Sequence, residues 1–287
     1  MSLSSQCIPS FLDISSSFIS KKQPGLERFF NIPKLAGVMP ASQLEIRPTP
    51  KMVSSGIGEL DLLTGGLPRG CLAEVCGPAS SGRTSMLLAV LAASTQRNEV
   101  YVLVDVSDAF DPISAQLAAV NFERLLWVRC GKFFGTKSFS TKTNAGNRQI
   151  AGPVEQALRV TDLLLQSGGF GLVIIDLGDV PLKIARRIPL TLWFRFQRAV
   201  ENTPTVLLVI ASAPCTQTCA SLLLKLQASG KKLSAGGSQL PEKENTVPSH
   251  SQLLGGLEIE GSLLRSRMER KPVQSVIRFA TKAIRAE

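Results

Sequence analysis

The sequence has few of the residues on which metal sites and membrane spans depend. It contains one histidine, His250, and its only close cysteine pair outside apolar runs is Cys215 and Cys219, so a four-ligand zinc site is not expected. No apolar run approaches the roughly 18 residues that a transmembrane helix needs. The first twenty residues lack the basic start and apolar block of a secretory signal. These absences predict a cytoplasmic protein with no membrane partner.

The composition is that of a globular protein with an excess of positive charge. The chain has 287 residues, 44% of them hydrophobic, which is sufficient for one large α/β domain or two small ones. Lys and Arg outnumber Asp and Glu by 32 to 22, which gives a formal net charge of +10. Such an excess is typical both of proteins that bind nucleic acid and of proteins with a solvated basic surface.

Three segments are expected along the chain. Residues 1–23 are rich in serine and predict a flexible N-terminal arm. Residues 24–52 contain LERFFNIPKLAG, which predicts a short helix, packed on its own domain or docked on another protein, followed by a linker. Residues 53–287 predict one core, with a disordered loop at about 228–252 and a closing hairpin at 257–280.

Short apolar runs alternate with amphipathic ones inside this core. Strands are expected at 72–76, 100–105, 124–130, 171–176 and 205–212, and helices at 85–94, from Pro112, at 153–168 and at 190–200. Strands that are apolar on both faces are typical of parallel sheets covered by helices on both sides. The sequence therefore predicts an α/β fold, a mostly parallel sheet flanked by helices, with a C-terminal antiparallel hairpin.

The stretch GPASSGRTS, residues 77–85, has the spacing of a phosphate-binding (P-loop) segment between a strand and a helix. Glycines let the backbone wrap an anion, amides at the helix start bind it, a cation meets the outer phosphates and a hydroxyl holds magnesium. The alternative is an ordinary glycine-rich turn. The expected nucleotide ligands are Gly77, Pro78, Ala79, Ser80, Ser81, Gly82, Arg83, Thr84, Ser85 and Asp176.

Acidic residues at strand ends complete the expected site. Asp176 closes the apolar run LVIID and, with Thr84, is the expected magnesium ligand when a nucleotide is bound. Asp111 precedes Pro112 and predicts a helix N-cap. Arg83 stands where a phosphate loop usually has lysine, and its guanidinium is a wider, planar group than an ammonium. ATP and magnesium are therefore expected as weak ligands.

The segment SSGIGELDLLTGGLPRGCLAEVCGPASSGRTS resembles the opening of the RecA core, and VDVSDAFDPISAQ and EQALRVTDLLLQSGGFGLVIIDLGDVP resemble later parts of it. The resemblance covers roughly residues 53–212 and implies the RecA-type fold. It also implies that Ser107 replaces the glutamate that polarises the attacking water, and that Ser212 and Ala213 replace an Asn-Gln pair that senses the γ-phosphate. Because serine cannot accept that proton at neutral pH, very weak or absent ATP hydrolysis is expected.

The shortened core and the arginine-rich end, LEIEGSLLRSRMERKP, are similar to the ImuA family of translesion synthesis accessory proteins. This similarity implies an SOS-response role in DNA repair at the bacterial nucleoid. The implied partners are DNA, a RecA filament, translesion polymerase components and a second copy of the chain. The candidate DNA contacts, which could equally be solvated surface charges, are Arg186, Arg187, Arg265, Arg267, Arg270 and Lys271.

Two other functions remain open from the sequence. An active DNA-dependent ATPase or recombinase would use Asp108 or Asp105 in place of the missing glutamate. A pure interaction protein would retain the loop as a relic and would recruit RecA or a polymerase through the LERFF segment.

Overall fold

The computed structural model describes residues 49–130, 152–234, 254–267 and 275–281. The strands are β1 Met52–Val53, β2 Leu67–Pro68, β3 Leu72–Cys76, β4 Tyr101–Asp105, β5 Leu125–Arg129, β6 Leu172–Leu177, β7 Val206–Ala211, β8 Leu222–Ser234, β9 Leu254–Ser266 and β10 Val276–Ala280. The helices are α2 Gly58–Thr64, α3 Arg83–Gln96, α4 Pro112–Leu117, α5 Gly152–Ser167, α6 Leu182–Ala185 and α7 Leu190–Val200, with a 3-10 turn at Phe122–Arg124. The expected arm, the LERFF segment, His250, Arg270 and Lys271 lie outside the described residues.

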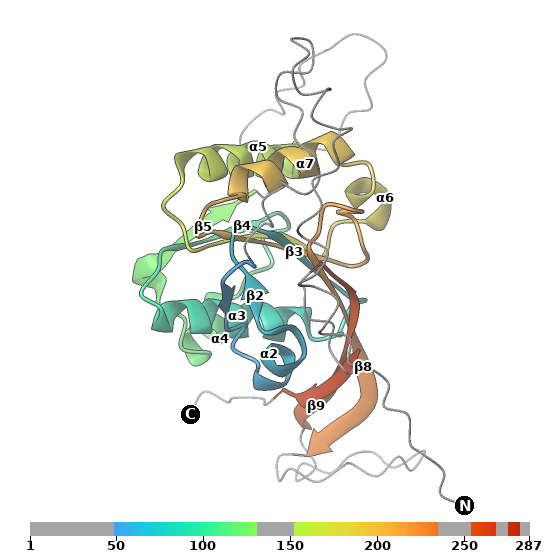
Figure 1. The fold of residues 1–287 in the computed structure, drawn as a ribbon. Helices are drawn as coiled ribbons and strands as arrows, with labels where there is room; N and C mark the ends of the chain where they lie inside the picture. Colours follow the sequence, from blue (N-terminus) through green and yellow to red (C-terminus); the bar gives the residue numbers. More distant parts are fainter. Residues whose placement is uncertain (1–48, 131–151, 235–253, 268–274, 282–287) are drawn as a thin grey trace, which may run out of the picture. The chain divides into compact units, whose positions relative to one another are not determined.

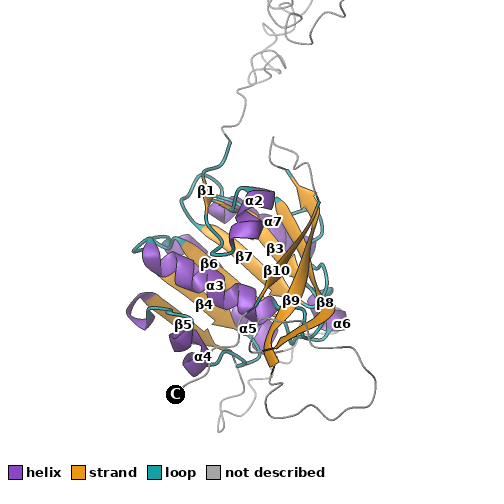
Figure 2. Ribbon diagram, turned by 90° about the horizontal axis from the view of Figure 1, so that it is seen from below, coloured by secondary structure: helices purple, strands orange, loops and turns teal. Residues whose placement is uncertain are grey.

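Eight strands form one mixed sheet in the order β10-β9-β8-β3-β7-β6-β4-β5, while β1 and β2 pair separately. Neighbours from β8 to β5 run parallel, and β9 and β10 add antiparallel strands beyond β8 (Figure 2). Helices α5 and α7 cover one face, and α2, α3 and α4 lie on the other (Figure 1). The predicted fold class is therefore confirmed.

The apolar strands are buried because helices cover both faces of the sheet. In β4, Tyr101 and Leu103 pack in the core that includes residues of α3, while Val102 and Val104 pack in the core that includes residues of α5 and α7. Alternate side chains of a strand point to opposite faces, so a strand between two helical layers has no polar face. This burial explains why the central strands are almost entirely apolar, with Glu74 in β3 as an exception among the buried positions.

Helix α4 begins where the sequence predicted a cap. The Asp111 carboxylate accepts hydrogen bonds from the amides of Ile113 at 3.2 Å and Ser114 at 3.0 Å, and Pro112 occupies the first turn. These bonds satisfy helix-end amides that have no partner within the helix. The prediction of an N-cap at Asp111 is confirmed.

The predicted hairpin at 257–280 corresponds to the antiparallel pair β9 and β10, and strand β8 pairs with β9 on its other side. Strand β8 runs to Ser234 and pairs with β9 from Leu222 to Ser234, with three irregularities in register. Strand structure thus extends into the segment 228–252 that was expected to be a loop, which corrects its start. The stretch KKLS ends strand β8, and Lys232, Leu233 and Ser234 pair through the backbone with β9.

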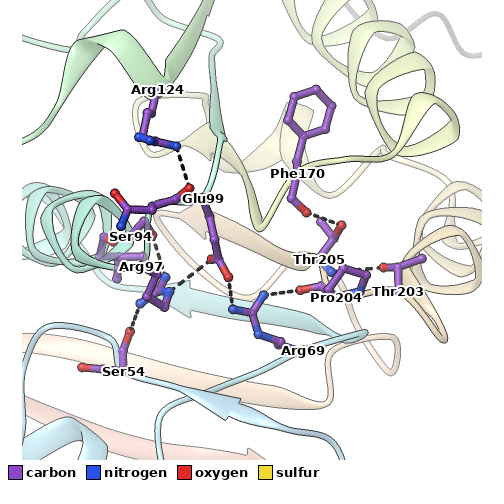
Figure 3. Close-up of polar contacts among 12 residues, drawn as sticks. Ser54, Arg69, Ser94, Arg97, Glu99, Arg124, Phe170, Thr203, Pro204 and Thr205 are labelled. Atoms are coloured by element: carbon purple, nitrogen blue, oxygen red, sulfur yellow. Dashed lines mark hydrogen bonds and ion pairs between the residues drawn. The ribbon is translucent and has the colours of Figure 1, made fainter.

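A network of arginines joins the amino ends of the strands. The Glu99 carboxylate lies between Arg69 and Arg97 (Figure 3), with the Arg97 Nε 3.2 Å from Glu99 Oε2 and a shorter contact to Arg69. Arg97 also donates to the Ser54 carbonyl at 3.1 Å, and Arg69 donates to the Pro204 carbonyl. One acidic side chain therefore connects the segments that precede α2, β4 and β7.

We expect Glu99→Ala to lower the free energy of unfolding by about 1–2 kcal/mol, because the variant leaves two adjacent, largely buried guanidinium groups without their shared carboxylate. Chemical denaturation monitored by circular dichroism would measure this change. Glu155→Ala is the matched control, since it breaks an exposed pair with Arg159 within helix α5 and should change stability by about 0.5 kcal/mol or less. Equal effects of the two variants would contradict a structural role for the network.

Candidate functional site

The loop 77–85 and the predicted acidic residues meet at one edge of the sheet. The loop joins β3 to α3, and the sheet register places Val75 beside Ile210, Ile210 beside Asp176 and Asp176 beside Asp105. Because these strands are parallel, their carboxyl ends lie at the same edge, where α/β proteins bind ligands. The expected placement of Asp176 near the loop is observed.

The loop backbone presents unpaired amides at the start of helix α3. Ser80 and Gly82 have positive φ values of 60° and 92°, which turn the chain tightly before the helix begins. Within the described part of the chain, the amides of residues 79, 80 and 82–85 donate to no carbonyl or side chain. A row of free amides at a helix N-terminus is suited to bind a phosphate group.

Ser81 gives a second indication of a ligand. Its hydroxyl is buried and has no hydrogen-bond partner among the described residues, and its side chain is only 1% exposed. A Cβ added at Gly77 would overlap this hydroxyl and the Leu226 carbonyl of β8, so only glycine fits at Gly77. An orphaned buried hydroxyl inside a loop of free amides fits an anionic ligand.

Gly82 is equally constrained by packing. A Cβ at this position would overlap the δ-methyl of Ile259 from β9, which is 1% exposed. Strands β8 and β9 therefore contact the loop at both of its glycines, through Leu226 and Ile259. These contacts give the loop glycines a structural requirement that does not depend on a ligand.

The Arg83 guanidinium contacts the turn that follows β6. Its Nη1 donates to the Gly178 carbonyl at 2.6 Å, and its Nη2 lies 3.9 Å from Asp179 Oδ1. The side chain is only 12% exposed, so this contact holds the guanidinium in a fixed place. Arg83 thus connects the loop to the turn that follows β6.

Asp176 and Thr84 are the residues that could hold a magnesium ion. The Thr84 side chain is exposed and its hydroxyl has no partner in the described ranges. Asp176 Oδ1 accepts the Gly178 amide at 2.8 Å. Burial raises the Asp176 pKa to about 6, opposed by the Gly178 hydrogen bond and Arg83 and reinforced by Asp105. Among the residues that the structure describes, this site included, no group of three His, Cys, Asp or Glu side chains could hold a metal without further ligands.

The two carboxylates that could replace the missing glutamate both make structural contacts. Asp105 is buried and accepts the amides of Ala109 at 3.1 Å and Phe110 at 2.9 Å. Asp108 accepts two hydrogen bonds from Arg129, at 2.6 and 2.7 Å, and these bonds lower the Asp108 pKa. Ser107 lies between them and is exposed.

Two adjoining cavities open beside the loop. The first, of about 140 Å³, is lined by residues that include Arg83, Thr84 and Asp176. The second, of about 560 Å³, lies among α2, α3, α4 and β10. Leu88 and Ser114 line both, so the two cavities lie next to each other. A charged group could occupy the first cavity while a larger, partly apolar group fills the second.

The predicted DNA contacts fall into two groups. Arg186 and Arg187 follow α6, are exposed, and form no ion pair within the described residues. Arg265 in β9 donates to the Gln217 carbonyl, and Arg267, just after β9, donates to the Thr218 carbonyl. Both carbonyls lie in the loop before β8. Figure 1 shows α6 on the same side of the sheet as this orange loop.

Sequence reasoning missed Glu74, Gly178 and Ile259. Glu74 is fully buried in β3, where its carboxylate accepts the amides of Cys215 at 2.6 Å and Thr216 at 3.3 Å and also the Thr216 hydroxyl. The one signal in the sequence was an acidic residue within the apolar run LAEVC. A charged residue in a strand buried on both faces requires polar partners from elsewhere in the chain.

The region around the loop is similar in sequence to known proteins. Residues 36–132 match the family model of the RecA N-terminal domain. The chain is 31% identical to Protein RecA of Thermus thermophilus over 140 residues, which cover 49% of this chain and 34% of RecA. It is 35% identical to Protein RecA of Psychrobacter cryohalolentis over 127 residues, covering 44% of this chain and 30% of that protein. These matches support a RecA-like family for this part of the chain.

The similarity has clear limits in length. The chain spans about a third of the length of the curated relatives that it matches. The family match ends at residue 132, so it includes the loop and Ser107 but not Asp176. None of the described helices is long and apolar enough to cross a membrane.

Proposed function

We propose that this chain is a RecA-like accessory protein that binds a nucleotide with little or no hydrolysis and acts at DNA during damage tolerance. The observation that carries the proposal is the open row of amides at the start of α3, next to the unpaired Ser81 hydroxyl. Similarity to RecA supports ATP and magnesium as the ligands. The loop would hold the phosphates, Thr84 and Asp176 the magnesium ion, and the second cavity the nucleoside.

The surroundings of Ser107 support binding without turnover. Magnesium, when bound, would neutralise phosphate charge, but hydrolysis also needs a group that orients or deprotonates water. Serine cannot accept a proton at neutral pH, and Asp108 and Asp105 are held by Arg129 and by backbone amides. These contacts favour an accessory protein over the alternative, an active DNA-dependent ATPase or recombinase.

Isothermal titration calorimetry of the full chain with ATP and ADP, with and without magnesium, tests the binding proposal. We expect binding that Gly82→Ala abolishes. Absence of heat with either nucleotide, from protein that circular dichroism shows to be folded, would overturn the proposal. A steady-state ATPase assay with single-stranded DNA tests the second part, and turnover equal to that of an intact RecA would exclude the accessory role.

We expect Ser107→Glu to raise ATP turnover by about tenfold or more, because a positioned general base contributes about 10²–10⁴ in rate and only part of this is recovered by one substitution. Ser107→Gln is the matched control, since it has the same length but cannot accept a proton. A phosphate-release assay would compare the two variants. Equal rates would show that a missing base does not limit turnover.

The exposed arginines support the proposal of a DNA partner. Lys183, Arg186 and Arg187 present unpaired positive charge beside α6, and Arg265 and Arg267 are fixed by backbone carbonyls. We propose that these residues follow a phosphate backbone, and that a RecA filament or a translesion polymerase is the protein partner. Fluorescence anisotropy with single-stranded DNA should show weaker binding for Arg186→Ala/Arg187→Ala and a smaller salt dependence.

A further inference from the structure

Arg83 forms a contact that leaves it unable to serve the loop as a phosphate ligand. The guanidinium donates to the Gly178 carbonyl at 2.6 Å and lies near Asp179. The turn fits tightly around it, because a Cβ added at Gly178 would lie 2.7 Å from Arg83 Nη1 and 2.9 Å from Asp176 Oδ1. Gly178 thus leaves the space that the arginine occupies.

Apart from Arg83, the charged residues that line the first cavity are all acidic. Its charged residues are Arg83, Asp111, Asp176 and Asp179, so one paired guanidinium faces three carboxylates. Asp111 and Asp176 accept backbone amides, which fixes their carboxylates in place. The loop amides can bind the inner phosphates. The described lining has no unpaired cationic side chain for a further phosphate.

The amides and the cation serve different parts of a nucleotide. Amides at a helix N-terminus bind one phosphate group closely, whereas each further phosphate adds negative charge that a cation must neutralise. With Arg83 held by Gly178, a terminal third phosphate gains no cationic side chain, and it lies in a cavity that Asp111 and Asp179 line in addition to the proposed magnesium ligand Asp176. The loop amides would still bind the inner phosphates without Arg83.

We propose that this site takes a nucleoside diphosphate in preference to a triphosphate, and that Arg83 is a positioning residue that clamps the turn Gly178–Asp179. This inference rests on the proposed nucleotide binding and names its ligand class. ADP found in the site would then not be evidence of ATP hydrolysis, because ADP itself is the nucleotide that binds. Arg83 would instead hold the turn that leads to α6 and its basic residues.

Calorimetry of the full chain with ADP and ATP, each with and without magnesium, tests the preference. We expect ADP to bind about tenfold more tightly than ATP, because the third phosphate adds negative charge beside carboxylates without gaining a charge-assisted hydrogen bond. Arg83→Gln, which keeps a donor for the Gly178 carbonyl, should retain ADP affinity within about threefold for the same reason. Arg83→Lys should shift the preference toward ATP, because an ammonium can meet a terminal phosphate.

Hydrogen exchange without nucleotide tests the clamp separately. Arg83→Ala should speed amide exchange in residues 178–187, while Arg159→Ala, an exposed arginine of α5, should leave that segment unchanged. Unchanged exchange in Arg83→Ala would overturn the clamp.

The outcomes distinguish this inference from the proposed function. Tighter binding of ATP than of ADP by the natural chain, or a loss of about tenfold in affinity for both nucleotides in Arg83→Gln, would assign the guanidinium to phosphate binding. Either result overturns the inference and leaves nucleotide binding established. Binding of neither nucleotide to the folded chain overturns both.

Discussion

Glu74→Ala is expected to lower the free energy of unfolding by about 3–5 kcal/mol, the effect of removing a buried, multiply hydrogen-bonded carboxylate. Glu74 is fully buried in β3, three residues before the phosphate loop. The variant would leave the amides of Cys215 and Thr216 and the Thr216 hydroxyl buried without an acceptor. Urea denaturation followed by tryptophan fluorescence and circular dichroism would measure the loss.

Two matched variants define the cause. Glu74→Gln keeps the volume and one acceptor, and should therefore lose about half as much stability as the alanine variant. Glu155→Ala removes a carboxylate that pairs with Arg159 on the exposed face of α5, where such pairs contribute about 1 kcal/mol or less. A loss in Glu74→Ala no greater than in Glu155→Ala would show that the loop after β7 does not depend on Glu74.

Gly82→Ala is expected to cost about 2–4 kcal/mol and to remove nucleotide binding. The estimate combines an alanine at positive φ with overpacking of the core. The new methyl group would overlap Ile259 Cδ1 and lie 2.9 Å from Ile259 Cγ1. The loop or the hairpin must move, and either shift disturbs the amides that face the ligand. Thermal unfolding and calorimetry with ADP would measure the two effects.

A double-mutant cycle identifies the overlap as the cause. Ile259→Val removes the δ-methyl and should cost about 0.5–1.5 kcal/mol alone. The double variant Gly82→Ala/Ile259→Val should lose about 1 kcal/mol less unfolding free energy than the two single variants lose together, because the shorter side chain partly relieves the clash. Gly152→Ala is the control, since a Cβ there meets no atom within 4 Å. Strict additivity in the cycle would contradict contact between the loop and β9.

The local features of the fold could be predicted from the sequence. The run YVLVD predicted a strand because every residue is apolar until the final carboxylate, and β4 ends at that residue, Asp105. Asp111 predicted a helix start because a cap and a proline are adjacent in the chain. The loop 77–85 was recognisable because its glycines and hydroxyl lie at fixed offsets. In each case the cause lies within a few residues.

The direction of the Arg83 side chain could not be predicted in this way. Its partner, Gly178, lies 95 residues away in the sequence and offers a backbone carbonyl, which any residue carries. Glu74 has the same difficulty, because its partners lie 141 and 142 residues away. The extent of β8 was missed because backbone pairing in a hairpin leaves little trace in side-chain composition. These features depend on contacts that only the folded topology creates.

The packing of Leu226 and Ile259 against the loop glycines has a consequence for biosynthesis. The loop is made before β8 and β9, the strands that pack against its two glycines. A nascent chain still attached to the ribosome without β9 would lack the Ile259 contact, so it could not complete the phosphate cradle. Ligand capture during translation would therefore await release of the C-terminal strands, and premature termination before Ile259 would yield a product without the finished site.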